Sequence, residues 1–283
     1  MNHKKPQLVE PSVESPVSTR VEKKQVEERL AIGPQVVYET IRLEGEVELR
    51  RTPVALAWSA LAAGLSMGFS FIAEGLLMAH LPDRPWRPLI TKFGYSIGFL
   101  IVVLGRQQLF TENTVTVVLP VLLGRNVATF LRMLRLWGIV LGVNLVGTFT
   151  FALCFGKIMM FDAHTQQCLS EIGKAHLASP GIVLLRAIFA GWLIALMVWL
   201  LPAAEGAKVW IIIIITYMIG LGGFNHIIAG STTMFFLVVT HYLSFGTYLT
   251  QFFLPTLAGN VIGGVSLVAA LNHAQVVSGK EEP

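Results

Sequence analysis

The residue with the clearest capacity for chemistry is His226, the one imidazole in the apolar stretch from Val209 to Val239. It follows the glycine-rich sequence from Gly220 to Asn225, and that stretch contains no Asp, Glu, Lys or Arg. A lone histidine in a soluble core is usually a hydrogen-bonded structural residue. An imidazole titrates near neutral pH, however, and ionisable groups at membrane depth commonly serve function. The position therefore predicts a proton-dependent site at His226.

A second polar interruption runs from Arg106 to Thr114, divides another long apolar segment and contains Leu109-Phe110-Thr111. We expect Thr111 or Asn113 to cap the half-helix after this break, and Asn225 to cap the half-helix after the glycine-rich one. The positive ends of both helix dipoles would then face the same region, an arrangement that suits an anion. The two breaks therefore predict an anion pathway.

Helices that cross a bilayer must position these residues. One crossing takes roughly 20 mostly apolar residues at about 1.5 Å of rise each. Six segments of the chain approach or exceed this length: 53–79, 93–123, 136–155, 181–201, 209–239 and 248–271. The sequence therefore predicts an all-α integral membrane protein with six transmembrane helices.

The second and fifth segments are longer than one crossing needs, and each is broken in its middle. Each is also the middle member of a three-helix half. Interrupted helices in matching places of two halves indicate inverted repeats with the transport site between them. Unpaired backbone groups at membrane depth are tolerated only inside protein or beside a wet cavity, so we expect the breaks to line a pathway. The alternative is a pair of glycine kinks that only bend the helices.

The composition argues against several other classes. Hydrophobic residues make up 54% of the 283 positions and charged residues only 13%, about half the share found in soluble domains. The net charge of +4 comes from basic residues in the N-terminal region and short loops, which favours a lipid bilayer over nucleic acid as the partner. Their excess on one side predicts that both termini are cytoplasmic. Cys154 and Cys168 have no metal-ligand spacing, so we expect free thiols and no cofactor.

The chain divides into three parts. Residues 1–52 form an N-terminal tail without a signal peptide, which we expect to be cytoplasmic. Residues 1–33 have too few large apolar groups to fold and are predicted to be disordered. The stretch from Gln35 to Arg51 has the spacing of an amphipathic helix, either lying on the membrane surface or merely solvated. Residues 53–273 form the transmembrane channel domain, and 274–283 a cytoplasmic C-terminal tail.

Four short motifs, in the right order, give the chain a family resemblance over nearly all of residues 53–273. They lie in the second, third, fifth and sixth segments: Leu109-Phe110-Thr111, Asn144-Leu145-Val146-Gly147, Gly223-Phe224-x-His226-x-Ile228-Ala229, and Pro255-x-x-x-Gly259-Asn260-x-Ile262-Gly263-Gly264. On these residues the chain resembles the formate/nitrite transporter family of pentameric channels, and in particular its divergent bacterial inner-membrane members with a long N-terminal tail.

The resemblance implies an aquaporin-like protomer in a homopentamer of the bacterial inner membrane, with one pore through each protomer. Leu109 and Phe110 would form part of an apolar constriction, and His226 would lie in the chamber beyond it, across from Thr111. The family's substrates are small monovalent anions such as formate, nitrite and hydrosulfide. A naked anion would lose its hydration in such a pore, so we expect passage as the protonated weak acid.

Several positions depart from the family's pattern. Arg106-Gln107-Gln108 stands where the family has Gly-Ala and an acidic residue, and Asn225 stands where an acidic residue often precedes the histidine. Gly191 aligns with the family's asparagine in the fourth segment, and Lys174 with its lysine before that segment. A pore for a small neutral solute therefore stays open as an alternative, as does a non-conducting membrane scaffold or sensor. No nucleophile and base pair can be traced, so we do not expect an enzyme.

Arg106 is the most unusual residue of the second segment. It lies about 14 residues after Lys92, roughly 21 Å along a helix, which is too deep for the side chain to reach the outer interface. We expect its charge to be met by the buried carboxylate of Glu112 or Glu74. The alternative is that it faces the pathway as a fixed positive charge that attracts an anion.

Overall fold

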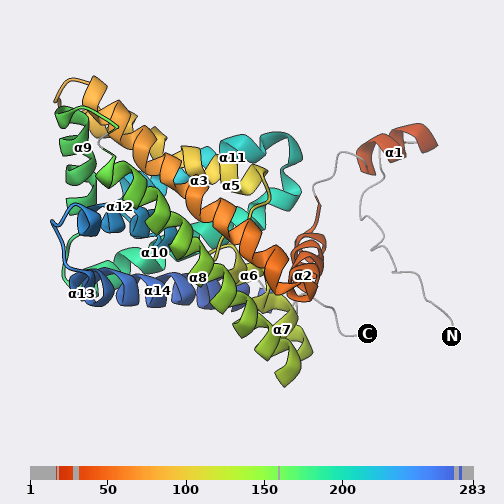
Figure 1. Ribbon diagram of the computed structural model, residues 1–283. Helices are drawn as coiled ribbons and strands as arrows, with labels where there is room; N and C mark the ends of the chain where they lie inside the picture. Colours follow the sequence, from red (N-terminus) through yellow and green to blue (C-terminus); the bar gives the residue numbers. More distant parts are fainter. Residues whose placement is uncertain (1–16, 18, 28–31, 159, 271–273, 276–283) are drawn as a thin grey trace. The chain divides into compact units, whose positions relative to one another are not determined.

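The fold is all helical in a computed structural model that describes residues 17, 19–27, 32–158, 160–270 and 274–275 (Figure 1). Every regular element in these ranges is a helix, which confirms the predicted class. The chain separates into two compact units, Met1–Gly33 and Pro34–Pro283. The first unit contains the helix α1, Arg20–Glu27. Most of the stretch predicted to be disordered, residues 1–33, lies outside the described residues.

Four described helical stretches are long and apolar enough to cross a bilayer. They are α3 (Pro53–His80), the run of α4, η1 and α5 (Arg87–Thr91, Lys92–Tyr95 and Ser96–Leu104), α8 (Val127–Lys157), and α10 with η2 (Pro180–Leu200 and Leu201–Ala203). The sequence explains where α3 begins. Pro53 occupies its first turn, and Thr52 Oγ1 accepts a hydrogen bond from Ala55 N at 3.3 Å.

Two apolar segments, the second and the fifth, are interrupted where the sequence is polar or rich in glycine. After α5 the chain runs without regular helix through residues 105–112, and then forms α6 (Asn113–Thr116) and α7 (Val118–Gly124). The helices α11 (Lys208–Leu221) and α12 (Ile227–Val239) are separated by residues 222–226. The helical stretches Asn113–Gly124, Lys208–Leu221 and Ile227–Val239 are each shorter than one bilayer crossing, so each break is flanked by at least one apolar helix that could not cross alone.

Helices α3 and α8 run side by side, as do α10 and the last segment of the chain (Figure 1). That segment consists of η4 (Tyr248–Phe253), α14 (Leu254–Val261) and η5 (Ile262–Ala270), of which η4 and η5 are π-helical. Glycines let the paired helices approach closely. A Cβ on Gly64 would lie 2.3 Å from Asn144 O, and one on Gly191 would lie 2.4 Å from Asn260 O. No asparagine side chain could therefore occupy the place of Gly191 in this packing.

The third segment and the loop after it differ from the prediction. Helix α8 begins at Val127, well before residue 136, because Asn126 caps it. Arg132 and Arg135 lie close to this N-terminal end, where long side chains can reach water, so the helix tolerates their charges. Cys168, which falls between the third and fourth predicted segments, lies in the helix α9 (Ala163–Lys174). Its side chain is buried, because Cys168 is on the face of α9 that packs against the protein. A short amphipathic helix of this kind carries no signal of membrane length.

The helix expected from Gln35 to Arg51 is present as α2, Pro34–Arg50. Its buried face consists of Val37, Tyr38, Ile41, Gly45 and Leu49. This face packs against α6 and α7, and a Cβ on Gly45 would lie only 2.0 Å from Thr116 O. One face of helix α2 therefore rests on the protein's own second segment, a contact that the sequence did not indicate.

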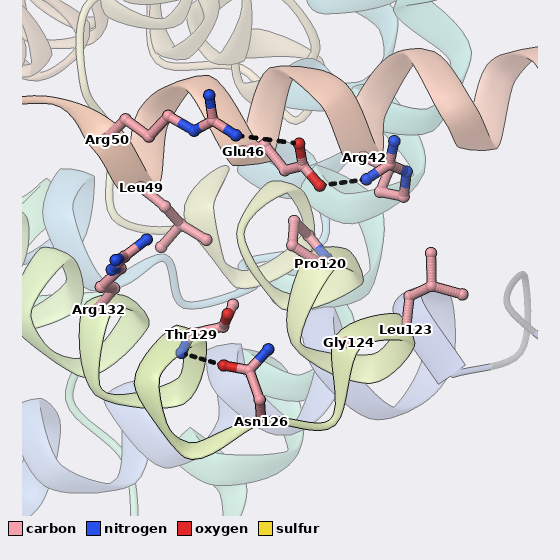
Figure 2. A pocket seen from close by; sticks show the side chains of 10 residues that line it. All are labelled: Arg42, Glu46, Leu49, Arg50, Pro120, Leu123, Gly124, Asn126, Thr129 and Arg132. Atoms are coloured by element: carbon pink, nitrogen blue, oxygen red, sulfur yellow. Dashed lines mark hydrogen bonds and ion pairs between the residues drawn. The ribbon is translucent and has the colours of Figure 1, made fainter.

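A cavity of about 200 Å³ lies at the edge of this contact, among α2, the end of α7 and the start of α8 (Figure 2). Glu46 pairs there with Arg42, and its other carboxylate oxygen lies 3.8 Å from Arg50 Nη2. Asn126 Oδ1 accepts a hydrogen bond from Thr129 N at 2.8 Å. The end of α7 is therefore flanked by charged side chains of α2 and by the polar cap of α8.

Candidate functional site

The two breaks meet at His226 and Thr111. Thr111 lies in the break of the second segment, His226 ends the break of the fifth, and both are fully buried. His226 Nε2 lies 2.7 Å from Thr111 Oγ1. The rings of His226 and Phe99 of α5 pack in a T shape, with centroids 5.0 Å apart. The structure therefore brings together two residues that are 115 positions apart in the chain.

The imidazole of His226 also caps α12. Its Nδ1 accepts a hydrogen bond from Ala229 N at 3.1 Å. A backbone N–H can only donate, so Nδ1 must carry a lone pair, and the proton of the neutral ring is assigned to Nε2. Nε2–H then donates to Thr111 Oγ1. A second proton on Nδ1 would break the cap and add positive charge at the positive end of a helix dipole.

The caps predicted from the sequence are wrong. Asn225 does not cap α12, because His226 occupies the cap position and Asn225 Oδ1 is bonded to His176 instead. Neither Thr111 nor Asn113 caps α6, whose first turn has no side-chain cap. Asn113 Nδ2 donates to Gln108 Oε1 and Leu109 O, and Thr111 points to the histidine. These polar side chains of the two breaks therefore bond to other parts of the breaks or to neighbouring residues, and do not cap the helices.

A buried asparagine fastens each break. Asn144 of α8 accepts from Phe110 N at 3.0 Å, and its Nδ2 donates to Gln108 O and Ala60 O at 2.9 and 2.7 Å. Gln108 and Phe110 belong to the break of the second segment, whereas Ala60 belongs to α3. One side chain therefore ties an irregular stretch of backbone to a continuous helix, and satisfies groups that would otherwise be unpaired.

The second asparagine repeats this pattern in the other half. Asn260 of α14 accepts from Ile227 N at 2.8 Å, and its Nδ2 donates to Asn225 O and Ala187 O, both at 2.8 Å. Ala187 lies in α10, so the bonds again join a break to the first helix of its half. Both asparagines occur in the motifs that carry the family resemblance, but the sequence did not indicate what they bond.

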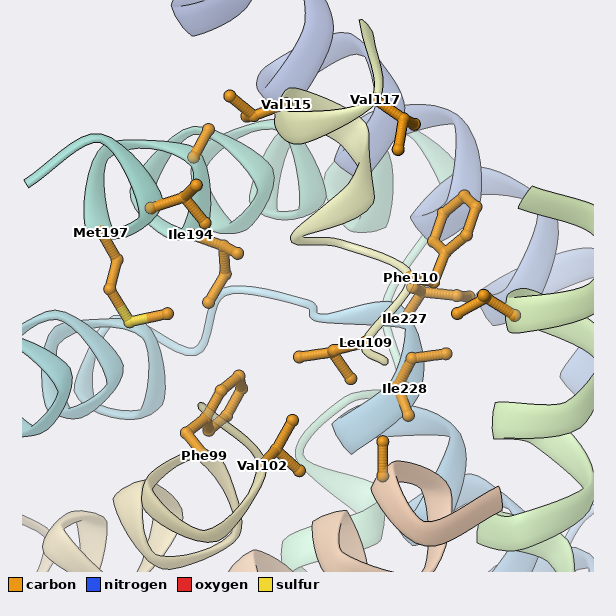
Figure 3. Packing of buried hydrophobic residues seen from close by; sticks show 14 of the residues in the cluster. Phe99, Val102, Leu109, Phe110, Val115, Val117, Ile194, Met197, Ile227 and Ile228 are labelled. Carbon is orange, nitrogen blue, oxygen red and sulfur yellow. The ribbon is translucent and has the colours of Figure 1, made fainter. Parts of the chain in front are cut away.

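Apolar side chains surround the histidine on the side of the second segment. Leu109 is fully buried, and Phe110 packs edge to face against Trp137 with ring centroids 5.6 Å apart. Figure 3 shows Leu109 between α5 and the start of α12, near Phe99 and Ile228. Together these groups make an apolar layer beside the polar contact of the two breaks. Such a layer excludes water and makes the passage of a bare charge costly.

The partners expected for Arg106 are wrong. Its side chain is 82% exposed, and its nearest carboxylate oxygen belongs to Glu44 of α2 at 3.8 Å. Glu74 is paired with Lys92 instead, and Glu112 Oε1 has no hydrogen-bond partner within the described part of the chain. Depth counted along a straight helix was misleading, because the helix ends at Leu104 and the chain then turns, with Arg106 at a positive φ of 49°.

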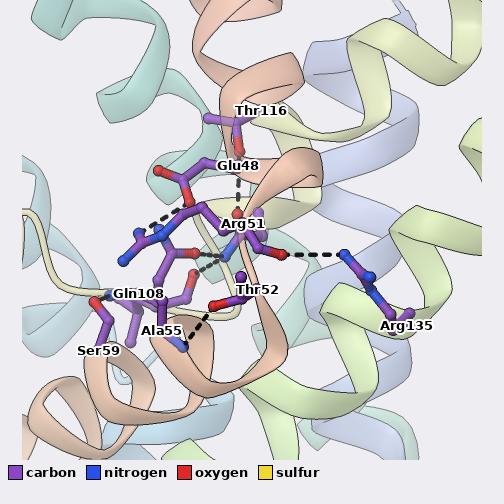
Figure 4. A network of polar contacts seen from close by, with 10 residues as sticks. Glu48, Arg51, Thr52, Ala55, Ser59, Gln108, Thr116 and Arg135 are labelled. Carbon is purple, nitrogen blue, oxygen red and sulfur yellow. Dashed lines mark hydrogen bonds and ion pairs between the residues drawn. The ribbon is translucent and has the colours of Figure 1, made fainter.

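The backbone around this turn is held by contacts to neighbouring helices (Figure 4). Gln108 N donates to Ser59 Oγ of α3 at 3.1 Å. Close by, Arg135 Nη2 of α8 donates to Leu49 O and Arg51 O, where α2 leads into α3. The break of the second segment is thus bonded to α3, and the connection between α2 and α3 is bonded to α8.

His176 is a site residue that the sequence did not single out. It lies in the connection from α9 to α10, and its Nδ1 is 2.9 Å from Asn225 Oδ1. Lys174, aligned with the family's lysine, does not reach the break; its Nζ lies 4.3 Å from the centroid of the Tyr242 ring. Nothing local marks His176, because its partner is 49 positions further along the chain.

No three His, Cys, Asp or Glu side chains gather among the described residues in a way that could hold a metal ion. Both cysteines are free thiols. The polar groups that the two breaks bring together are the imidazole of His226 and the hydroxyl of Thr111, inside an apolar surround.

Membrane-length apolar helices and two interrupted helices that meet at a buried histidine define a polytopic membrane transport protein. The sequence model of the formate/nitrite transporter family matches residues 35–274. The chain belongs to this family, as the motifs predicted.

Relatives of known sequence and structure agree with this assignment. The chain is 42% identical over 266 residues to the inner membrane protein YfdC of Escherichia coli (strain K12), covering 93% of this chain and 86% of that protein. It is 26% identical to the formate channel BtFdhC of Bacillus thuringiensis, over 83% of this chain and 92% of that one. An FNT family ion channel superposes with a TM-score of 0.74 at 20% sequence identity, covering 84% of this chain and 98% of that one. A pentameric formate channel with formate bound superposes with a TM-score of 0.66, also at 20% identity, covering 80% and 98%. The structural likeness establishes a shared fold.

Proposed function

We propose that the protein is a channel of the bacterial inner membrane for a small monovalent anion or its conjugate weak acid, with formate and nitrite as the leading solutes. The observation that carries the proposal is the contact of His226 with Thr111 where the two breaks meet. Membership of the family and the formate channels among the relatives support the substrate class. The name of the E. coli relative supports the location.

The proposed assembly rests on a relative of similar fold, and the proposed topology rests on the bonding of two asparagines and on the distribution of charge. The chain would form a homopentamer with a pore through each protomer, as in the pentameric formate channel of similar fold. Six transmembrane segments would form two inverted repeats, an arrangement supported by the matching bonds of Asn144 and Asn260. Both termini would be cytoplasmic, because the positive charges favour that side.

In the proposed mechanism, His226 and Thr111 offer polar contacts where a solute leaves the apolar layer of Leu109 and Phe110. An anion loses hydration in that layer, whereas the protonated acid crosses it at far lower cost. His226 Nε2–H donates a hydrogen bond to an oxygen of the solute in place of Thr111. A second proton on the ring releases Ala229 N–H and creates an imidazolium that attracts an anion, which gives transport its dependence on pH.

Flux in proteoliposomes tests the proposal. Formate and nitrite are compared with the neutral solutes urea and glycerol, each with and without a pH gradient. The variant His226→Asn keeps a residue that can cap α12 and removes the titrating ring. We expect it to assemble normally and to lose the pH dependence of formate flux. The matched control is His164→Asn, an exposed histidine of α9, which should behave as the wild type. An unchanged pH profile in His226→Asn would remove the proposed role of the histidine.

One observation favours a second function, a pore for a small neutral solute. Amides stand at Gln107, Gln108 and Asn225, around the breaks, so a small neutral solute could also find hydrogen-bond partners there. Flux of urea or glycerol without flux of any weak acid would establish that alternative. Absence of flux for every solute would point to a non-conducting scaffold or sensor.

A further inference from the structure

The side chain of Asn225 has an unused hydrogen-bonding group beside the proposed pathway. Asn225 is fully buried and directly precedes His226. Its Oδ1 meets His176 Nδ1 at 2.9 Å, while its Nδ2 has no partner in the described part of the chain. Its backbone carbonyl is fixed by Asn260 Nδ2 at 2.8 Å. The amide is therefore held in place with one of its two polar ends unpaired.

A buried amide that lacks a partner is costly, so such groups usually mark a place where something else bonds. The orphan lies in a break of the membrane-spanning structure, one residue from the histidine that caps α12. Glu112 and Gln107 also have orphan oxygens, but both lie in the other break. Only acceptors are orphaned there, whereas at Asn225 the orphan is a donor.

The pair offers one donor and one acceptor, whichever way the amide is turned. With Oδ1 toward His176, the ring nitrogen Nδ1 carries the proton, Nε2 has a lone pair, and Asn225 Nδ2 donates. With the amide turned over, Nδ2 donates to Nδ1, Nε2 carries the proton, and Asn225 Oδ1 accepts. A neutral imidazole and an amide therefore always leave a donor on one residue and an acceptor on the other.

The surroundings of His176 keep the ring uncharged. Burial lowers the pKa of His176 to about 4, an effect opposed by the hydrogen bond to Asn225 and reinforced by the positive charges of Lys92 and Arg186. The rings of His176 and Phe252 pack in a T shape, with centroids 5.9 Å apart. Both members of the pair are therefore neutral near pH 7.

We propose that Asn225 and His176 form a neutral binding site for the undissociated form of a small oxyacid, next to His226 on the same path. The inference rests on the proposed function and names the form of the solute that this side of the path accepts. The acid's hydroxyl donates to the acceptor of the pair, and its C=O or N=O oxygen accepts from the donor. An anion has acceptors only, so its charge would face the acceptor atom of the pair.

This site separates oxyacids from hydrogen sulfide. Formic and nitrous acids carry both a hydroxyl and a doubly bonded oxygen, so an oxyacid that passes the pair can donate to its acceptor and accept from its donor. Hydrogen sulfide has no oxygen and forms weaker bonds. Loss of the pair should therefore slow formate and nitrite far more than hydrosulfide, whereas a general block of the path would slow all three alike.

The test compares the protein-dependent flux of formate and hydrosulfide at pH 6, after subtraction of the flux into protein-free liposomes, for wild type, Asn225→Leu, His176→Phe and His176→Gln. Asn225→Leu keeps the volume and removes both polar ends; His176→Gln keeps a donor and an acceptor. We expect formate flux to fall about tenfold or more in Asn225→Leu and His176→Phe, with hydrosulfide flux within about twofold of wild type. His176→Gln should recover part of the formate flux. The exposed-site control Asn126→Leu, in the connection to α8, should leave the ratio unchanged.

Equal losses for formate and hydrosulfide, or no loss for either, would overturn the inference. Failure of the proposed function is a different result, because the wild type itself would then pass neither solute. Size-exclusion profiles and thermal unfolding in detergent exclude variants that do not fold. If Asn225→Leu does not fold, formate flux in His176→Phe is compared with that in His176→Gln. His176 is not fully buried, so these two substitutions should be tolerated better.

Discussion

Replacing Asn260 by Leu should destabilise the protein strongly, because the substitution removes three buried hydrogen bonds at nearly constant volume. Ile227 N is in the first turn of α12 and has no helical acceptor, and Asn225 O lies in the break, so both lose their partner. Ala187 O lies inside α10, where a helical N–H still bonds it. Two orphaned buried groups at about 1–3 kcal/mol each give an expected loss of about 2–6 kcal/mol.

The measurement is the free energy of unfolding in mixed micelles, titrated with denaturing detergent. Asn126→Ala is a suitable reference, because it removes the side-chain cap of α8 and should cost only about 1 kcal/mol. Asn144→Leu should cost as much as Asn260→Leu, since its bonds follow the same pattern. If Asn260→Leu unfolds with the same free energy as Asn126→Ala, the bonds to the break contribute little and the reasoning fails.

Four further outcomes follow from the structure. Arg106→Gln should change the free energy of unfolding by no more than about 0.5 kcal/mol, because the side chain is exposed; collapse of expression and thermal stability would mean that a buried carboxylate depends on it. Deleting residues 2–33 should leave the proposed pentamer intact in mild detergent, as judged by mass measurement, since residues from Pro34 onward form a compact unit; loss of the assembly would show a structural role for the tail. The free energy of unfolding should fall as the pH drops from about 6.5 toward 4, because His176 binds a proton in the unfolded chain but not in the folded chain over this range. This loss should be smaller in His176→Gln, and the same pH profile in the variant and the wild type would contradict the reasoning. Gly191→Ala should lower the thermal unfolding temperature, because its Cβ would lie 2.4 Å from Asn260 O, and wild-type stability would refute that contact.

The sequence predicted the regular elements well where length and hydropathy decide them. The bounds of α3 and α10 agree with the expected segments to within one or two residues. The stretches that mark the two breaks are visible as polar or glycine-rich runs, because irregular backbone in a membrane needs such residues. Helix α9 was missed because a short amphipathic helix looks like a loop when only apolar length is counted.

One contact between candidate site residues was predicted, whereas most of the bonding around it was not. His226 and Thr111 were expected to lie together, and the structure places them 2.7 Å apart. The cap of α12 was assigned to Asn225 because asparagine is the better capping residue, whereas a histidine with an unprotonated Nδ1 fills the role here. The partner of Arg106 could not be found from distance along the chain, because a turn with positive φ redirects the side chain. His176 gave no signal at all, since its bond to Asn225 depends on tertiary contact.

The bonds of Asn144 and Asn260 limit which motions can accompany transport, and therefore its rate. Each break is tied to a continuous helix, so moving its backbone would mean breaking several buried bonds at once. Rearrangements of that kind take microseconds to seconds, whereas side-chain rotations are far faster. We therefore expect the apolar layer at Leu109 and Phe110 to open by rotamer changes on a fixed frame. Turnover would then keep pace with diffusion of the solute and show no slow conformational cycle.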